Sequence, residues 1–205
     1  DRTGEILLYE IHGEEKRTVI SLAEIPDVAK QAALVAEDIN FYNHIGIDFR
    51  GILRAFLVDI LKGGIVQGGS TITQQLVKNS LLSGEENLSQ KFSRKFKEVL
   101  LALAAETRYS KDEILELYLN QIPYGSNAYG IASASQTFFS KNPKELTLGE
   151  AALLAALPKA PTYYSPFGSH KDELFKRRDW VLDRMAAEGF IEKEEAEKAR
   201  SEKIS

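Results

Sequence analysis

Residues 68–79 read GGSTITQQLVKN, in which a glycine pair precedes a predicted helix over residues 70–82. Thr71, Gln74 and Lys78 fall at positions i, i+3 and i+7 and therefore share one face of that helix. Backbone N–H groups at a helix start, with the hydroxyls of Ser70 and Thr71 beside them, favour an anion. The face suits an extended phosphate-bearing ligand such as a pyrophosphate. The P-loop pattern is absent, and the alternative is an N-capped amphipathic helix whose polar face meets water.

Outward from this stretch, most of the chain has the apolar spacing and capping residues of helices. Residues 110–113 and 147–150 are capping boxes, and Gly189 is a predicted C-cap. The first twenty residues instead predict a β-hairpin, with strands over 5–11 and 17–20. The fold class is therefore mainly α with a short N-terminal β-hairpin. The predicted helices cover residues 27–37, 49–61, 70–82, 92–109, 127–139, 150–157, 171–188 and 192–201, and a further helix begins at the capping box of residues 110–113.

Composition limits the function classes. The chain has 205 residues, 43% hydrophobic and 27% charged, which is enough for one sizeable core or two small lobes. A net charge of −4 and a pI of about 5.6 argue against a nucleic-acid partner. There is no cysteine, so disulfides and thiolate metal sites are excluded, and the three histidines lack metal-ligand spacing. No signal peptide or transmembrane run is found, so we expect any anchor segment to lie outside this sequence.

Residues 37–46 read EDINFYNHIG and place two adjacent carboxylates, Glu37 and Asp38, at the end of an apolar helix. Aromatic residues, a histidine and a glycine follow. A carboxylate against apolar surface can have its pKa raised toward neutrality, which suits general acid or base catalysis. The alternative is a frayed helix end with solvated acids.

Two further segments have both a functional and an ordinary interpretation. Residues 94–98 read RKFKE, three cations with one acid, which could bind phosphate or could form an Arg94–Glu98 pair on a solvated face. The predicted helix over residues 49–61 carries large apolar side chains flanked by Arg50, Arg54 and Lys62. That pattern is typical of a core helix and also of an interfacial membrane helix.

Taken together and in this order, the segments resemble the peptidoglycan glycosyltransferase family (glycosyltransferase family 51). The similarity covers about residues 21–190 and rests on five ordered motifs. The segment 82–93 departs from the family pattern, being longer and lacking an arginine that often lies there, for which Lys91 is the candidate substitute. The motifs are residues 37–46, residues 68–79, Arg94-Lys95-x-x-Glu98, residues 111–130, and residues 151–166.

The resemblance implies a lysozyme-like, single glycosyltransferase domain over residues 1–205. Residues 1–20 would be a lead-in hairpin, residues 47–69 a smaller membrane-facing lobe, and the remainder a larger head lobe. It also implies a location at the outer face of the bacterial cytoplasmic membrane. The membrane-facing residues would be Phe49, Ile52, Leu53, Phe56, Leu57 and Ile60.

The resemblance further implies polymerisation of lipid II into β-1,4-linked glycan, with inversion and release of undecaprenyl pyrophosphate. Glu37 would be the general base on the acceptor 4-hydroxyl, and Glu98 a second carboxylate. No tightly bound cofactor is expected, with a divalent cation (Mg or Mn) at the pyrophosphate left open. Substrate-binding residues would be Asp38, Phe41, His44, Ser70, Thr71, Gln74, Gln75, Lys78, Arg94 and Lys95.

The implied partners are lipid II, the lipid-linked glycan chain, the membrane surface, a moenomycin-type inhibitor and a fused or separate transpeptidase. Two other functions stay open at this point. A lysozyme-like hydrolase would also use two carboxylates across a sugar site, although it needs no cationic face. A non-catalytic glycan- or lipid-binding module would not need Glu37 or Glu98.

Overall fold

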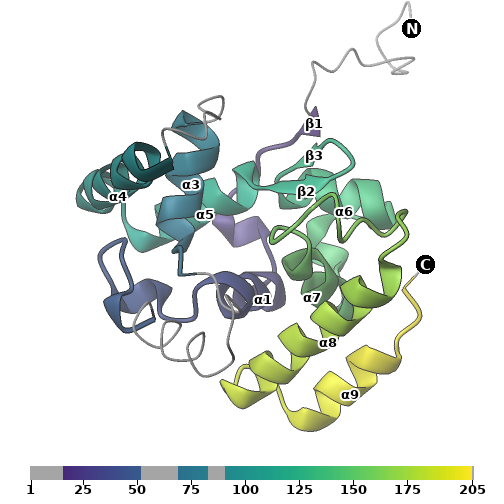
Figure 1. Cartoon of the computed structure of the whole chain (residues 1–205). Coiled ribbons are helices and arrows are strands. Elements are labelled where there is room, and N and C mark those ends of the chain that lie inside the picture. The colour runs from purple at the N-terminus through teal and green to yellow at the C-terminus, as the bar shows by residue number, and fades with distance from the viewer. Residues whose placement is uncertain (1–15, 52–68, 83–90, 205) are drawn as a thin grey trace, which may run out of the picture.

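The computed structural model describes residues 16–51, 69–82 and 91–204, and over these the protein is mainly helical (Figure 1). Short 3₁₀ turns cover Leu22–Glu24, Phe41–Asn43 and Pro143–Glu145. Three short strands, β1 (Lys16–Arg17), β2 (Pro123–Gly125) and β3 (Ala128–Tyr129), form one small sheet. The α-helices are α1 (Asp27–Glu37), α3 (Ile72–Leu81), α4 (Lys91–Arg108), α5 (Lys111–Gln121), α6 (Ile131–Phe139), α7 (Leu148–Ala156), α8 (Lys171–Ala187) and α9 (Lys193–Ser201).

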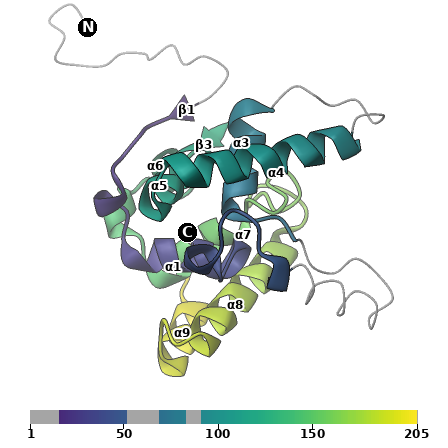
Figure 2. The ribbon, with the colours of Figure 1, turned by 90° about the vertical axis from the view of Figure 1, so that its left-hand side faces the viewer.

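Two central helices, α5 and α7, organise the core. Every residue of α7 from Gly149 to Ala156 is buried, as expected for a helix that is apolar on all sides. Its small side chains allow α1 and α8 to pack closely against it, and α9 covers α8. On the other side, α3 packs against α4 and α5 (Figures 1 and 2). The C-terminal end of α1 therefore lies between the α3–α4 pair and α8.

Local sequence signals place most helix ends correctly. The side chains of Ser110 and Thr147 accept hydrogen bonds from the backbone N–H groups of Glu113 and Glu150, so both predicted capping boxes are confirmed. Gly189 follows α8 with a φ of +76°, the left-handed conformation of a C-cap glycine. The predicted helix over residues 70–82 begins at Ile72, because Thr71 is its N-cap.

The prediction of a helix over residues 127–139 is wrong at its start. Ser126 and Asn127 have φ values of 52° and 57°, and consecutive left-handed residues make a tight hairpin turn. The turn joins β2 and β3 in an antiparallel pair, while β1 pairs with β3 in parallel. The helix begins only at Ile131.

Other predictions fall partly or wholly beyond the described residues. Most of the predicted N-terminal hairpin is one of these, because residues 1–15 lie outside the described structure. Its second strand, predicted over residues 17–20, is wrong beyond Arg17: β1 covers Lys16–Arg17, and residues 18–20 are not in a strand. Residues 49–51 are helical, and the rest of the helix predicted over residues 49–61 lies outside the described residues. So do residues 83–90 of the segment 82–93 that departs from the family pattern. No helix in the part of the chain that is described is long and apolar enough to cross a membrane.

Gly130, the N-cap residue of α6, is expected to tolerate alanine poorly. Its φ is +80°, and an added Cβ would lie 2.5 Å from the backbone oxygen of Asn120, which cannot move cheaply because the Asn120 side chain binds Ile20. Gly130→Ala should lower the free energy of unfolding by about 3 kcal/mol in urea titration. Gly189→Ala is the matched control, since it shares the positive φ but meets no atom within 4 Å. It should lose only about 1 kcal/mol, and equal losses would contradict the steric explanation.

Candidate active site

A cleft of about 990 Å³ opens where the end of α1 meets the start of α3, the first half of α4 and one side of α8. Among the described residues, seven cationic side chains and five carboxylates line it, although the whole chain carries a net charge of −4. The cleft is therefore the place in the described structure where positive charge is concentrated around a few acids. The cations are Lys78, Arg94, Lys95, Lys159, Lys176, Arg177 and Arg184, and the acids are Glu37, Asp38, Asp48, Glu98 and Glu173.

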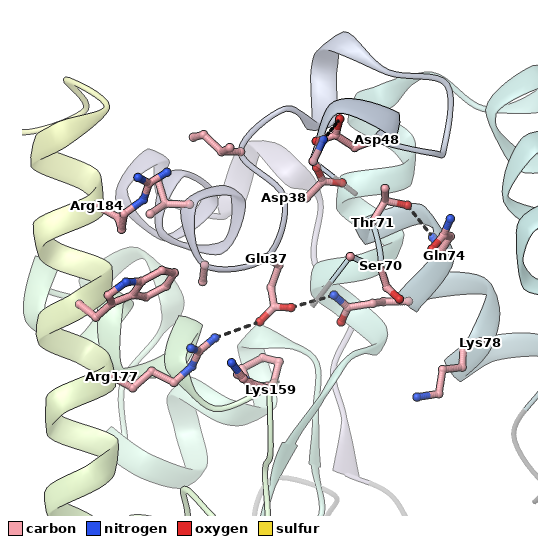
Figure 3. A pocket seen from close by; sticks show the side chains of 18 of the residues that line it. Glu37, Asp38, Asp48, Ser70, Thr71, Gln74, Lys78, Lys159, Arg177 and Arg184 are labelled. Carbon is pink, nitrogen blue, oxygen red and sulfur yellow. Dashed lines mark hydrogen bonds and ion pairs between the residues drawn. The ribbon is translucent and has the colours of Figure 1, made fainter. Parts of the chain in front are cut away.

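Glu37, the last residue of α1, lies in the middle of this cleft (Figure 3). Its Oε2 accepts a hydrogen bond of 2.7 Å from the Gln75 side chain on α3. Its Oε1 faces the Arg177 guanidinium of α8 at 3.7 Å and receives no hydrogen bond from any described residue. One carboxylate oxygen is thus held in place, and the other has an unused lone pair.

Burial raises the pKa of Glu37 above its ordinary value, because the ionised carboxylate loses water that the protein only partly replaces. The Gln75 hydrogen bond and the charges of Arg177 and Lys159 act in the opposite direction. The same burial lowers the pKa values of Lys159 and Arg177. A carboxylate with a raised pKa is a stronger base, so Glu37 has the chemistry required of a proton acceptor.

A second cluster lies on α4, opposite α8. The Lys95 Nζ donates to Ser70 Oγ at 2.9 Å, to Gln74 Oε1 at 3.1 Å and to Glu98 Oε2 at 2.9 Å. Glu98 is only 5% exposed, and its other oxygen lies 3.7 Å from Arg94 Nε. Glu98 therefore holds two cations in position at the wall of the cleft, and Lys95 keeps about half of its side chain open to solvent.

Lys78 differs from the other cations on this side. It is exposed on the face of α3 that lines the cleft, and its side chain makes no hydrogen bond or ion pair with any residue the structure describes. Its charge is therefore available to a ligand. Figure 3 shows Lys78 on one side of Glu37 and the pair Arg177 and Arg184 on the other.

Asp38 and His44 fasten the first motif to the start of α3. Asp38 accepts the backbone N–H of Ile72 at 3.0 Å and the His44 Nε2–H at 2.9 Å, while His44 Nδ1 accepts the N–H of Gly46. The Thr71 hydroxyl donates to the Gly46 carbonyl at 2.7 Å and accepts from the Gln74 N–H. At the predicted anion site, the carboxylate of Asp38 thus takes the N–H of Ile72, and the Thr71 hydroxyl takes the N–H of Gln74.

The structure brings ten of the twelve predicted catalytic and substrate-binding residues to the cleft. Phe41 and His44 are not among the described residues that line it. Phe41 is fully buried in the core beneath Lys111, and His44 is turned toward Asp38. The ten residues are Glu37, Asp38, Ser70, Thr71, Gln74, Gln75, Lys78, Arg94, Lys95 and Glu98.

Sequence reasoning missed the cleft residues of the C-terminal half. Lys159 follows α7, and Arg177, Trp180 and Arg184 lie on α8 with spacings of three and four residues. That spacing was a usable signal, because it places the three on one helix face. In a helix as rich in charge as α8, however, such a face is indistinguishable from an ordinary solvated one.

The described residues of the cleft form no metal site of their own. Among the described residues no three histidine, aspartate or glutamate side chains gather as metal ligands would. The two oxygens of Glu98 already face Lys95 and Arg94. The divalent cation at the pyrophosphate stays a prediction.

The fold and the cleft together define a class. A desolvated glutamate with a free oxygen, facing cations suited to a phosphorylated leaving group, fits an enzyme that transfers a group from a phosphate-activated donor, and a binding module would not need it.

Comparison with known proteins agrees with this class. The family model described as Transglycosylase matches residues 4–186. Penicillin-binding protein 1A of Aquifex aeolicus (strain VF5) is 50% identical over 192 residues, which cover 94% of this chain and 26% of that protein. Penicillin-binding protein 1F of Bacillus subtilis (strain 168) is 48% identical over 182 residues, which cover 89% and 25%. The crystal structure of penicillin-binding protein 1A from Haemophilus influenzae superposes with a TM-score of 0.56 at 29% identity, covering 94% of this chain and 18% of that one.

The chain therefore belongs to the transglycosylase family, and it is a peptidoglycan glycosyltransferase domain. It spans about a quarter of the length of the curated relatives it matches.

Proposed function

We propose that this domain joins lipid-linked disaccharides with Glu37 as the general base. Glu37 takes the proton of the acceptor 4-hydroxyl as that oxygen bonds to the anomeric carbon of the donor. The bond between the anomeric carbon and the pyrophosphate breaks at the same time, and undecaprenyl pyrophosphate leaves with the electron pair. Attack from the face opposite the leaving group turns an α-linked donor into a β-1,4 linkage. The observation that carries this proposal is the unused Oε1 of Glu37 in a cation-lined cleft.

Lys78, Arg94 and Lys95 are the proposed binding groups for the pyrophosphate. A leaving group that gains negative charge departs more easily when fixed cations face it in a cleft that excludes water. Glu98 orients Lys95 and Arg94 rather than taking a proton, because both its oxygens face those cations. Asp38, Thr71 and His44 position Glu37 and α3.

The rival function is hydrolysis of finished glycan. A hydrolase needs a positioned water and has no use for a group of cations beside the base. Incubation with lipid II alone separates the two functions. Lengthening glycan chains and released undecaprenyl pyrophosphate are expected, whereas shortening of preformed glycan with no growth on lipid II would overturn the proposal.

The membrane is the proposed source of both substrates. Phe49, at the start of the predicted membrane-facing helix, is 69% exposed, and the nearby Ile45 is 68% exposed. Exposed apolar side chains of this size suit the membrane interface. The other predicted membrane-facing residues, from Ile52 to Ile60, lie outside the described structure. Placement at the outer face of the cytoplasmic membrane, a transpeptidase in the whole protein and competition by moenomycin all belong to this proposal.

The pH dependence of the reaction should report the environment of Glu37. A base works only when deprotonated, so kcat/KM should fall toward acid pH, with a midpoint above the ordinary range of glutamate because burial raises the Glu37 pKa. Gln75→Leu removes the hydrogen bond that favours the ionised form, so the midpoint should move to higher pH. Initial rates of lipid II polymerisation across pH measure both midpoints. A Gln75→Leu profile that shifts toward acid would contradict this assignment.

A further inference from the structure

Trp180 is a large aromatic side chain in the cleft that the mechanism above does not use. It is the only tryptophan of the chain, it lines the cleft from α8, and it is 42% exposed. The Arg177 guanidinium lies 5.2 Å from the centre of its ring, an attractive cation–π distance. Arg177 is itself fixed by a 3.1 Å hydrogen bond to the carbonyl of Ala156. The Trp180 ring therefore packs on the fixed Arg177 side chain and still exposes part of its surface to the cleft.

The position of Trp180 relative to Glu37 indicates what it can contact. Glu37 is bound by Gln75 of α3 through one oxygen and faces Arg177 of α8 with the other. Trp180 is one helical turn beyond Arg177, and so lies on the α8 side of the base. Lys78 lies on the α3 side of the base (Figure 3). Lys95, on α4, binds Ser70 and Gln74 on that same side.

In-line chemistry assigns these two sides to different substrates. In a displacement with inversion, the attacking oxygen and the leaving group stand on opposite faces of the anomeric carbon. If the donor pyrophosphate rests on the α3–α4 cations, the acceptor sugar must approach from the α8 side. A pyranose ring has a face of C–H groups, and an exposed aromatic ring is the protein surface that packs best against such a face.

We propose that Trp180 is a stacking platform for a sugar ring of the acceptor and thereby sets the affinity for the acceptor rather than for the donor. This inference rests on the proposed function, since it takes Glu37 as the base and the α3–α4 cations as the pyrophosphate site. Trp180 touches no reacting atom in this account. It orients the acceptor so that its 4-hydroxyl lies against Glu37.

The test separates acceptor from donor in one kinetic assay. A lipid-linked tetrasaccharide whose terminal 4-hydroxyl is capped can only donate, and lipid II then serves as the acceptor. Trp180→Ala should raise KM for lipid II as acceptor roughly three- to tenfold and leave KM for the capped donor unchanged. Trp180→Tyr should restore most of the affinity. Phe190→Ala is the control, because Phe190 is 37% exposed but does not line the cleft, and it should change neither KM.

A rise in the donor KM, unchanged KM values, or a tyrosine variant as weak as alanine would each overturn the proposal. Thermal melting of all three variants shows whether a change in KM comes from unfolding. If the wild-type domain joins no sugars, the proposed function fails. Tryptophan fluorescence then tests separately whether Trp180 binds a sugar ring. All tryptophan emission comes from Trp180. A saturable change on adding the soluble disaccharide-peptide, without lipid or pyrophosphate, would support a sugar platform, and an unchanged spectrum would overturn it.

Discussion

Glu37→Gln is expected to fold normally and to polymerise lipid II about a thousandfold more slowly than the wild-type domain. The glutamine keeps an oxygen that can accept the Gln75 hydrogen bond, so the geometry at the end of α1 persists. It cannot take a proton from the acceptor hydroxyl, which is a poor nucleophile until a base acts on it. Initial rates of glycan formation from lipid II measure the loss.

The stability of the same variant gives an independent check. Because burial raises the pKa of Glu37, ionisation of this carboxyl opposes folding at neutral pH. The protonated carboxyl contributes stability below the pKa of Glu37 in the unfolded chain, and this contribution is lost as the pH rises through its pKa in the folded protein. Glu37→Gln should therefore melt at or above the wild-type temperature at neutral pH.

The matched control is Glu150→Gln, which alters another buried glutamate. Glu150 caps α7 and binds Lys141 at 2.7 Å, and it lies outside the cleft. This variant should melt lower and keep its turnover at low temperature. Turnover of Glu37→Gln within tenfold of wild type would refute the assignment of the base.

Lys78→Ala is expected to slow polymerisation about a hundredfold while leaving the melting temperature unchanged. The side chain is exposed and makes no hydrogen bond or ion pair with a described residue, so its removal breaks no such bond. What it removes is one positive charge facing the departing pyrophosphate. Polymerisation rates and thermal melting of the same preparation measure the two effects.

Two variants define the specificity of that result. Lys78→Arg keeps the charge and should retain most of the rate. Lys198→Ala removes an exposed lysine of α9 that does not line the cleft, and it should match the wild type. If Lys78→Ala polymerises at the rate of Lys198→Ala, the pyrophosphate is not bound on this face of α3.

Helices and their caps were predictable because their signals are local. The apolar spacing of α1, the boxes at Ser110 and Thr147 and the glycine after α8 each act within one or two turns. The hairpin before α6 was missed although its turn signal is local: residues 123–130 read PYGSNAYG and so contain the Gly, Ser and Asn typical of turns. Ser126 and Asn127 are left-handed there, which ends any helix that starts at residue 127.

The site was predictable where its residues are close in sequence and not where they come from distant helices. The second motif lies at a wall of the cleft. One N–H of the helix start that it suggested as an anion site, that of Ile72, is taken by Asp38, which only the folded loop brings there. Lys159 and Arg177 reach Glu37 because α7 and α8 pack on α1. No spacing along the chain predicts that packing.

The central claim is that one cleft holds the base and the departing diphosphate on either side of a sugar. A crystal structure of Glu37→Gln with a lipid-linked donor tests it most directly. We expect the diphosphate oxygens to lie within hydrogen-bond distance of Lys78 and Lys95. The anomeric carbon should then lie between the diphosphate and the side chain at position 37. A diphosphate bound instead against Arg177 and Arg184 on α8 would contradict the account.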